Sequence, residues 1–166
     1  MNHRNSVREG IARDKLDLLH AAAKGDRWRF IAKAPSVLLG MLKGKSFMEM
    51  ISSGAMDECY IPISQEQGEF LYLTARSQPA RTIVEFGTSF GISTIYLAAA
   101  LQDNGGGRVI TTELQPNKCS RAQTNLEQAG VAEFADIRAG DAMETLKGLT
   151  EPVDLVLLDG WKDLYL

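Results

Sequence analysis

The chain has 166 residues, of which 45% are apolar and 23% charged, a composition typical of a single globular domain and not of a disordered chain. Its net charge of -3 is uneven, because residues 1–56 carry ten lysines and arginines against five acids and residues 57–166 carry eight against sixteen. The acidic second part argues against a nucleic-acid-binding domain. The sequence contains no run of about 18 apolar residues, which is the length that would predict a transmembrane segment.

The first 56 residues are predicted to form an N-terminal helical cap. Helix breakers recur in it at Gly25, Pro35, Gly40, Gly44 and Gly54. Apolar residues between 28 and 42 are mixed with Lys33, Lys43 and Lys45, which is also the pattern of a basic amphipathic segment on an anionic membrane surface. Because proline and glycine interrupt that pattern, we favour a cap packed on the main domain or on a second subunit.

The two cysteines, Cys59 and Cys119, are too far apart in the sequence to form a metal or redox motif. The first residues lack the apolar core of a secretory signal. We therefore expect a cytoplasmic protein with two reduced thiols.

Strand and helix patterns alternate regularly from residue 80 onward. Strands are predicted at 81–86, 108–113, 135–140 and 153–159, and helices at 91–102, 116–129 and 141–149. Pro116 suits a first helical turn and Gly130 suits a helix end. The alternation predicts an α/β fold over residues 57–166, a Rossmann-like parallel sheet with helices on both faces.

The last predicted strand, VDLVLLD, is continuously apolar, as an interior strand would be. The alternating pattern stops after it, which would leave an apolar sheet edge. We expect either that a C-terminal portion is missing or that another chain covers this edge, as in a homodimer.

One loop fits two chemistries. GTSFG at residues 87–91 follows the first predicted strand and matches G-x-S-x-G, the nucleophile elbow of serine hydrolases. A serine nucleophile needs a histidine, which follows it in sequence in α/β-hydrolases, but the chain has only His3 and His20, both upstream of Ser89. A glycine-rich turn that opens a helix can instead cradle a nucleotide, and we favour this interpretation.

Acids at three strand ends indicate which nucleotide is bound. Glu113 ends the second strand, 22 residues after Gly91, where a carboxylate can accept hydrogen bonds from both ribose hydroxyls. The spacing of Gly87 and Gly91 departs from the G-x-G-x-x-G of dinucleotide binders, which disfavours an NAD-dependent oxidoreductase. Glu85 would repel a pyrophosphate but suits a cationic amine, and Asp141 could accept from an adenine amino group. S-Adenosylmethionine carries an amine, a ribose diol and an adenine.

With these residues in place, the chain from residue 60 to residue 166 resembles the class I S-adenosylmethionine-dependent methyltransferases. More narrowly, it resembles the small O-methyltransferases related to catechol and caffeoyl-CoA O-methyltransferases. The segments that carry the resemblance are YIPISQEQGEFLYLTA (60–75), VEFGTSFGIS (84–93) and LLDGWKDLYL (157–166). The resemblance implies the sheet order 3-2-1-4, S-adenosyl-L-methionine as cofactor and a small-molecule hydroxyl as methyl acceptor.

The resemblance also implies a role for each matched residue. Residues of the glycine loop would contact the methionine end of the cofactor, Glu113 the ribose, and residues 141 and 142 the adenine. The implied cofactor-binding residues are Ile63, Ser64, Glu85, Gly87, Ser89, Gly91, Ser93, Glu113, Asp141, Ala142 and Trp161.

By the same match, Asp159 would be a ligand of Mg²⁺ or another divalent cation, and Lys162 the general base. Mg²⁺ prefers carboxylate and carbonyl oxygens, and bound to two adjacent hydroxyls it would stabilise the phenolate. The sequence stops before the strand that supplies the other metal ligands in the family, so we expect little or no turnover from these 166 residues. A non-catalytic cofactor-binding module is the alternative.

Overall fold

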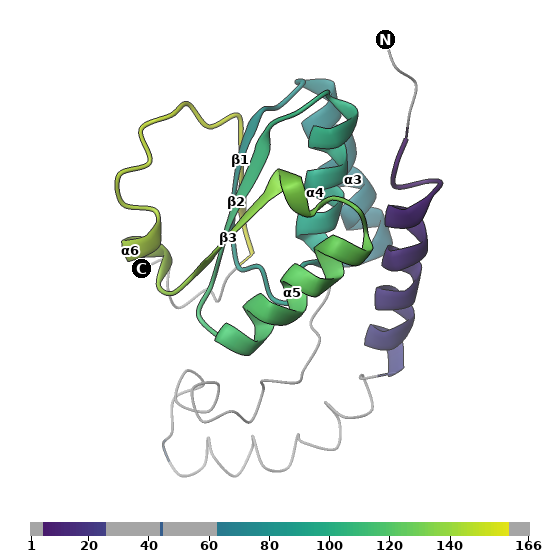
Figure 1. Ribbon diagram of the computed structural model, residues 1–166, viewed down its shortest axis with the longest axis horizontal. Coiled ribbons are helices and arrows are strands. Elements are labelled where there is room, and N and C mark those ends of the chain that lie inside the picture. The colour runs from purple at the N-terminus through teal and green to yellow at the C-terminus, as the bar shows by residue number, and fades with distance from the viewer. Residues whose placement is uncertain (1–4, 26–43, 45–62, 160–166) are drawn as a thin grey trace.

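The computed structural model describes residues 5–25, 44 and 63–159 of the chain (Figure 1). The predicted basic segment over residues 28–43 lies outside the described residues, as do Cys59, Trp161 and Lys162. Within the described ranges, no helix combines the length and the apolar character needed to cross a bilayer.

Four parallel strands form the central sheet: β1 (Thr82–Phe86), β2 (Arg108–Glu113), β3 (Ala135–Ala139) and β4 (Leu155–Leu158). Their order is β3-β2-β1-β4, which confirms the predicted order and the Rossmann-like fold. In the register of the sheet, Glu85 of β1 lies between Thr111 of β2 and Leu157 of β4. Because the strands run in one direction, their carboxyl ends meet at one edge, where α/β proteins bind ligands.

Helices lie on both faces of this sheet, as predicted. On one face are α4 (Ile92–Asp103) and α5 (Pro116–Gln128), with α3 (Gln65–Ser77) packed on α4 (Figure 1). The short α6 (Ala142–Thr145) lies on the other face, and a 3-10 helix, η1 (Ala132–Phe134), leads into β3.

Among the helices that the structure describes, α4 is the most enclosed. All of its residues except Gln102 are buried, because the sheet, α3 and α5 surround it. Its sequence, ISTIYLAAALQD, has no polar face, and a helix of this kind is stable only when it is covered on every side. By contrast, α5 is amphipathic and buries only Ala122, Asn125 and Leu126.

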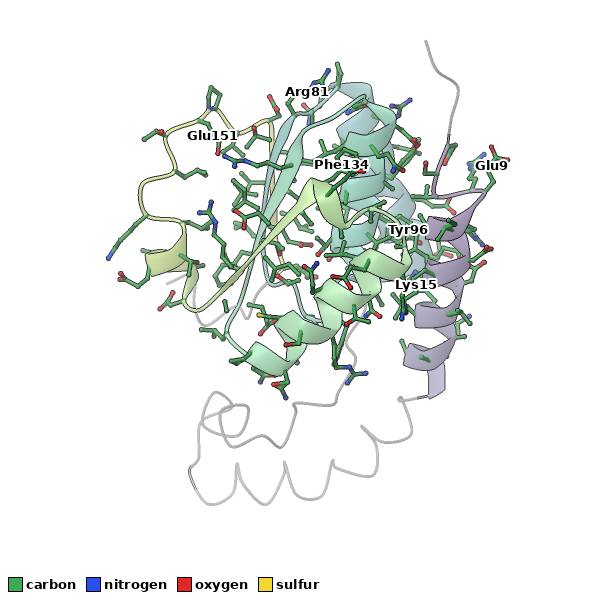
Figure 2. All side chains as sticks on the ribbon, in the orientation of Figure 1. Glu9, Lys15, Arg81, Tyr96, Phe134 and Glu151 are labelled. Atoms are coloured by element: carbon green, nitrogen blue, oxygen red, sulfur yellow. The ribbon has the colours of Figure 1, made fainter. Side chains whose placement is uncertain are left out.

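A helix over residues 11–25 packs against the same core as α3 and α4. Tyr96 of α4 faces this helix (Figure 2), and its hydroxyl lies 3.2 Å from Nε2 of His20. This helix lies within residues 1–56, whose assignment as an N-terminal helical cap stays a prediction. The side chains that it buries are Ala12, Leu16, Leu19 and Ala23.

The buried carboxylate of Asp103 binds the segment that precedes this helix in sequence. Asp103, the last residue of α4, accepts hydrogen bonds from the N–H and the hydroxyl of Ser6 at 2.9 and 2.8 Å. It also accepts from the hydroxyl of Tyr72 of α3 at 2.7 Å. A single side chain therefore joins the N-terminal segment, α3 and α4.

At one edge of the sheet, β4 differs from the interior strand that its apolar sequence predicts. Leu155 and Leu157 pack against the core, whereas Val156 and Leu158 are 54% and 63% exposed. The strand is shorter than the predicted 153–159, and the Asp154 carboxylate just before it accepts from the backbone N–H groups of Arg81 and Thr82. The apolar edge expected from the sequence is present, and such edges favour pairing with another strand.

Candidate functional site

Backbone hydrogen bonds bring the glycine loop and the predicted acids to one edge of the sheet. The N–H groups of Gly87 and Thr88 donate to the carbonyl oxygen of Thr112 at 3.2 and 3.0 Å, which folds the loop after β1 onto β2. The N–H of Gly140, after β3, bonds to the end of β2 at 2.8 Å. The N–H of Asp159, after β4, bonds to the end of β1 at 3.0 Å.

Three residues of the loop between β1 and α4 have left-handed backbone conformations, with φ of +102° at Gly87, +48° at Ser89 and +82° at Gly91. Glycine adopts such a conformation readily, whereas a residue with a side chain loses about 1 kcal/mol. A Cβ on Gly91 would also come within 3.3 Å of Ala122, so glycine permits close packing of the loop on α5. The loop leaves the first N–H groups of α4 without a side-chain cap, an arrangement that can bind an anion.

Glu85 is a carboxylate enclosed in the protein, with 0% of its surface exposed. Its Oε2 accepts from the hydroxyls of Thr94 at 2.5 Å and Thr111 at 2.7 Å. Its Oε1 is buried and has no hydrogen-bond partner in the described part of the chain. Burial raises the pKa of Glu85 and the charge of Asp159 raises it further, while neighbouring hydroxyls, that of Ser93 among them, lower it.

Glu113, at the end of β2, binds the backbone of the glycine loop. Its Oε2 accepts from the N–H of Ser89 at 2.9 Å, and its Oε1 accepts from the N–H of Gln115 at 3.0 Å. The carboxylate therefore ties the loop after β1 to the end of β2. A carboxylate oxygen has two lone-pair sites, so each can accept one more hydrogen bond, as a ribose diol would require.

Asp141 and Ala142 begin α6 after the third strand. The Asp141 carboxylate caps this helix, since its Oδ1 accepts from the N–H of Met143 at 2.8 Å. Ala142 is buried. The cap uses one lone-pair site of the carboxylate and leaves capacity for the predicted contact with adenine.

Ile63 and Ser64 lead into α3. Ser64 forms a capping box: its hydroxyl accepts from the N–H of Gln67 at 3.2 Å, and its own N–H donates to Oε1 of Gln67 at 2.8 Å. The cap uses the N–H of Ser64, and its carbonyl oxygen accepts from the N–H of Gly68 at 3.0 Å, so a backbone contact with a cofactor at this residue would use the second lone-pair site of that oxygen. Ile63 is half-buried against the core.

The serine of the G-x-S-x-G motif contributes its backbone to the site through the N–H that binds Glu113. His20 bonds to Tyr96, and burial lowers the pKa of His20 and raises that of Tyr96 to about 12. In the ranges that the structure describes, no serine–histidine pair forms at the loop; His3 lies outside them. Ser93, the other predicted serine, is buried in the first turn of α4.

Asp159 lies at the same edge, after β4. It is exposed as a residue, but nearby protein atoms displace part of the water around its carboxylate and so raise its pKa. Across residues 5–25, 44 and 63–159, no three acidic, histidine or cysteine side chains gather in a set that could hold a metal ion. Mg²⁺ prefers six oxygen ligands, some of them waters, so the described residues alone do not fit the implied metal site.

The hydroxyls that surround Glu85 were not predicted from the sequence. Thr94 and Thr111 are 0% exposed and Thr88 is 1% exposed. Their signal is the presence of threonines inside otherwise apolar runs, RVITTE in β2 and ISTIYL in α4, because buried hydroxyls need partners.

Comparison with known proteins gives a family model described as a methyltransferase domain, which matches residues 84–163. The catechol O-methyltransferase of Mycobacterium tuberculosis is 40% identical over 115 residues, which cover 69% of this chain and 51% of the relative. The catechol O-methyltransferase of Niastella koreensis is 40% identical over 109 residues, which cover 63% and 48%. The chain spans about half the length of these curated relatives.

Solved structures resemble the chain in fold as well as in sequence. The O-methyltransferase from Bacillus cereus in complex with SAH has a TM-score of 0.59 at 34% identity, over 68% of this chain and 53% of that chain. The O-methyltransferase TomG from Streptomyces achromogenes in complex with SAM has a TM-score of 0.58 at 33% identity, over 75% and 58%. These matches confirm the resemblance predicted from the sequence.

Proposed function

Because this chain is related to the class I S-adenosylmethionine-dependent O-methyltransferases, we propose that it binds S-adenosyl-L-methionine and serves methyl transfer to a hydroxyl of a small molecule. The observation that carries the proposal is Glu85, a fully buried carboxylate next to a glycine loop, one of whose oxygens has no hydrogen-bond partner among the described residues. A cationic amine would compensate the buried charge and donate to the free oxygen. A pyrophosphate at this position would be repelled.

In this proposal the cofactor lies along the carboxyl edge of the sheet. Glu85 would bind the amine of the methionine end, and the N–H groups at the start of α4 would bind its carboxylate, near Ser89 and Ser93. Glu113 would accept from the ribose diol. The bound cofactor supplies a methyl group on a sulfonium, and these residues hold and orient it. The remaining proposed contacts are Ile63, Ser64, Gly87, Gly91, Asp141, Ala142 and Trp161.

The proposed roles of residues that act on the methyl acceptor rest on the resemblance to the O-methyltransferases. Lys162 is proposed to take the proton of the acceptor hydroxyl. Asp159 is proposed as one oxygen ligand of Mg²⁺ or another divalent cation, whose other ligands would come from outside the described residues. A cytoplasmic location and a homodimer stay predictions.

Isothermal titration calorimetry of the chain with S-adenosylhomocysteine and with NAD tests the cofactor class. We expect binding of S-adenosylhomocysteine and none of NAD, because the buried Glu85 carboxylate would pair with an amine and repel a pyrophosphate. Binding of NAD without S-adenosylhomocysteine would overturn the proposal. Methyl transfer from S-adenosylmethionine to a catechol-type acceptor in the presence of Mg²⁺ tests the reaction itself.

A non-catalytic cofactor-binding module is the second candidate. It is favoured by the finding that, within the described ranges, Asp159 belongs to no group of three side chains that could hold a metal ion. Binding of S-adenosylhomocysteine together with no methyl transfer to hydroxyl acceptors would support the module and count against the enzyme.

A further inference from the structure

A chain of buried hydroxyl groups links Glu85 to the glycine loop. Thr94 from α4 and Thr111 from β2 both donate to Oε2 of Glu85, at 2.5 and 2.7 Å. The hydroxyl of Thr88, the second residue of the loop, lies 2.5 Å from that of Thr111 and 3.1 Å from the carbonyl oxygen of Thr112. The side chains of Glu85, Thr88, Thr94 and Thr111 are all buried.

The direction of these hydrogen bonds follows from counting protons. A hydroxyl has one proton, and Thr111 uses its proton in the hydrogen bond to the Glu85 carboxylate. Thr88 must therefore be the donor in the contact between the two threonines, and its one proton is shared between the Thr111 hydroxyl at 2.5 Å and the carbonyl oxygen of Thr112 at 3.1 Å. The carboxylate is thus held by a chain of donors that begins at the loop and passes through β2.

The two carboxylate oxygens of Glu85 therefore differ in their hydrogen bonding. Oε2 accepts two short hydrogen bonds, whereas Oε1 is buried without a hydrogen-bond partner among the described residues. Leaving a buried acceptor unpaired costs about 1–3 kcal/mol. A ligand donor that reaches Oε1 would recover this cost, and an ammonium group is the donor that best suits a carboxylate.

We propose that Thr111, together with Thr94, is a positioning residue that fixes the Glu85 carboxylate in one orientation and so makes Oε1 the acceptor for the ligand's ammonium group. This inference rests on the proposed function and adds residues that select for the amino-acid part of the cofactor. Without the two hydroxyls, the carboxylate could rotate or turn Oε2 toward the ligand, and the preference for an ammonium group would fall.

Two ligands separate this role from a general effect on folding. S-Adenosylhomocysteine carries the ammonium group, and 5′-methylthioadenosine has the same nucleoside thioether without the amino-acid part. For Thr111→Val, calorimetry should show about tenfold weaker binding of S-adenosylhomocysteine and an unchanged affinity for 5′-methylthioadenosine. Thr111→Ser, which keeps the hydroxyl, should restore the affinity. Thr94→Val removes the other donor and should repeat the loss.

Thr112→Val is the matched control, because it removes a buried hydroxyl from the neighbouring residue of β2, on the opposite face of the sheet. It should leave both affinities unchanged. Equal weakening of both ligands by Thr111→Val, or no change in either, would overturn the inference while the proposed function stands. If the parent chain binds neither ligand, the proposed function fails, and the inference fails with it.

Discussion

The backbone N–H of Ser89 donates to Oε2 of Glu113 over 2.9 Å, so the loop that leaves β1 and the acid that ends β2 form one hydrogen-bonded unit. Ser89 makes this contact from a left-handed backbone conformation. Whatever Glu113 binds is therefore linked to the backbone geometry of the loop, and the side chain of Ser89 is not needed for that link.

Replacing Glu113 with glutamine should weaken nucleoside binding. The amide keeps the size of the side chain but has only one oxygen, which cannot serve two backbone N–H groups and two ribose hydroxyls together. For Glu113→Gln we expect about 10- to 100-fold weaker binding of both S-adenosylhomocysteine and 5′-methylthioadenosine in calorimetry. Glu133→Gln, at an exposed acid of η1, is the control. A loss confined to S-adenosylhomocysteine would contradict the ribose role.

Glu85→Gln should make the ligand-free chain more stable at neutral and alkaline pH. Burial raises the pKa of Glu85 above its unfolded value, so its favourable contribution is complete below the unfolded pKa and is lost as the pH rises through the folded pKa. Glutamine does not titrate. In urea unfolding, the advantage of the variant should be larger at about pH 8 than at about pH 5.

The same variant should bind S-adenosylhomocysteine at least about tenfold more weakly, because it no longer offers a charge to the amine. Stability and binding would then change in opposite directions at one residue. A parent chain that gains stability relative to Glu85→Gln as the pH rises would show that the assigned direction of the pKa shift is wrong.

Ser89→Gly should stabilise the chain by about 0.5–1 kcal/mol in urea unfolding, since glycine adopts the left-handed conformation of this residue without strain. Ser89→Val should lower the stability by about 1–2 kcal/mol, because a branched side chain fits this conformation poorly. Ser89→Ala should weaken binding of S-adenosylhomocysteine only modestly. Loss of stability in Ser89→Gly would mean that the serine hydroxyl makes a stabilising contact in the folded chain.

Asp103→Ala should destabilise the chain by about 3–5 kcal/mol, because it leaves the buried donors of Ser6 and Tyr72 without their acceptor. Tyr72→Phe removes one donor and should cost only about 1 kcal/mol. Urea unfolding measures both, and amide hydrogen exchange over residues 11–25 should rise most in Asp103→Ala. Asp14→Ala, at an exposed acid, should change stability by less than about 0.5 kcal/mol. Equal losses in all three variants would contradict a clamp at Asp103.

The strands and helices could be predicted because their signals are local. RTIVEF and RVITTE are apolar runs next to glycines, and Pro116 and Gly130 mark the ends of α5 in the sequence itself. The acids Glu85 and Glu113 could be predicted for the same reason, since each sits at or near a strand end.

The partners of these acids could not be predicted, because they come from other elements. Thr111 reaches Glu85 only through the register of β1 and β2, and Thr94 only through the way in which α4 packs on β1. The use of the Ser64 N–H in a helix cap was visible in principle, as S-x-x-Q is a capping-box pattern. The partial burial of β4 depends on which elements pack against it, and the sequence of the strand alone does not specify them.

The hydrogen bonds of Asp103 to Ser6 and Tyr72 also have a consequence for the order in which the chain folds. The bond between Asp103 and Ser6 spans 97 residues of sequence, so the helix over residues 11–25 leaves the ribosome before α4 and has no place to dock until α4 exists. Closing a loop of that length is slow compared with the packing of α3 on α4, which only β1 separates in sequence. Docking of the N-terminal helix is therefore expected to be a late folding step, and until then its apolar face is available to chaperones.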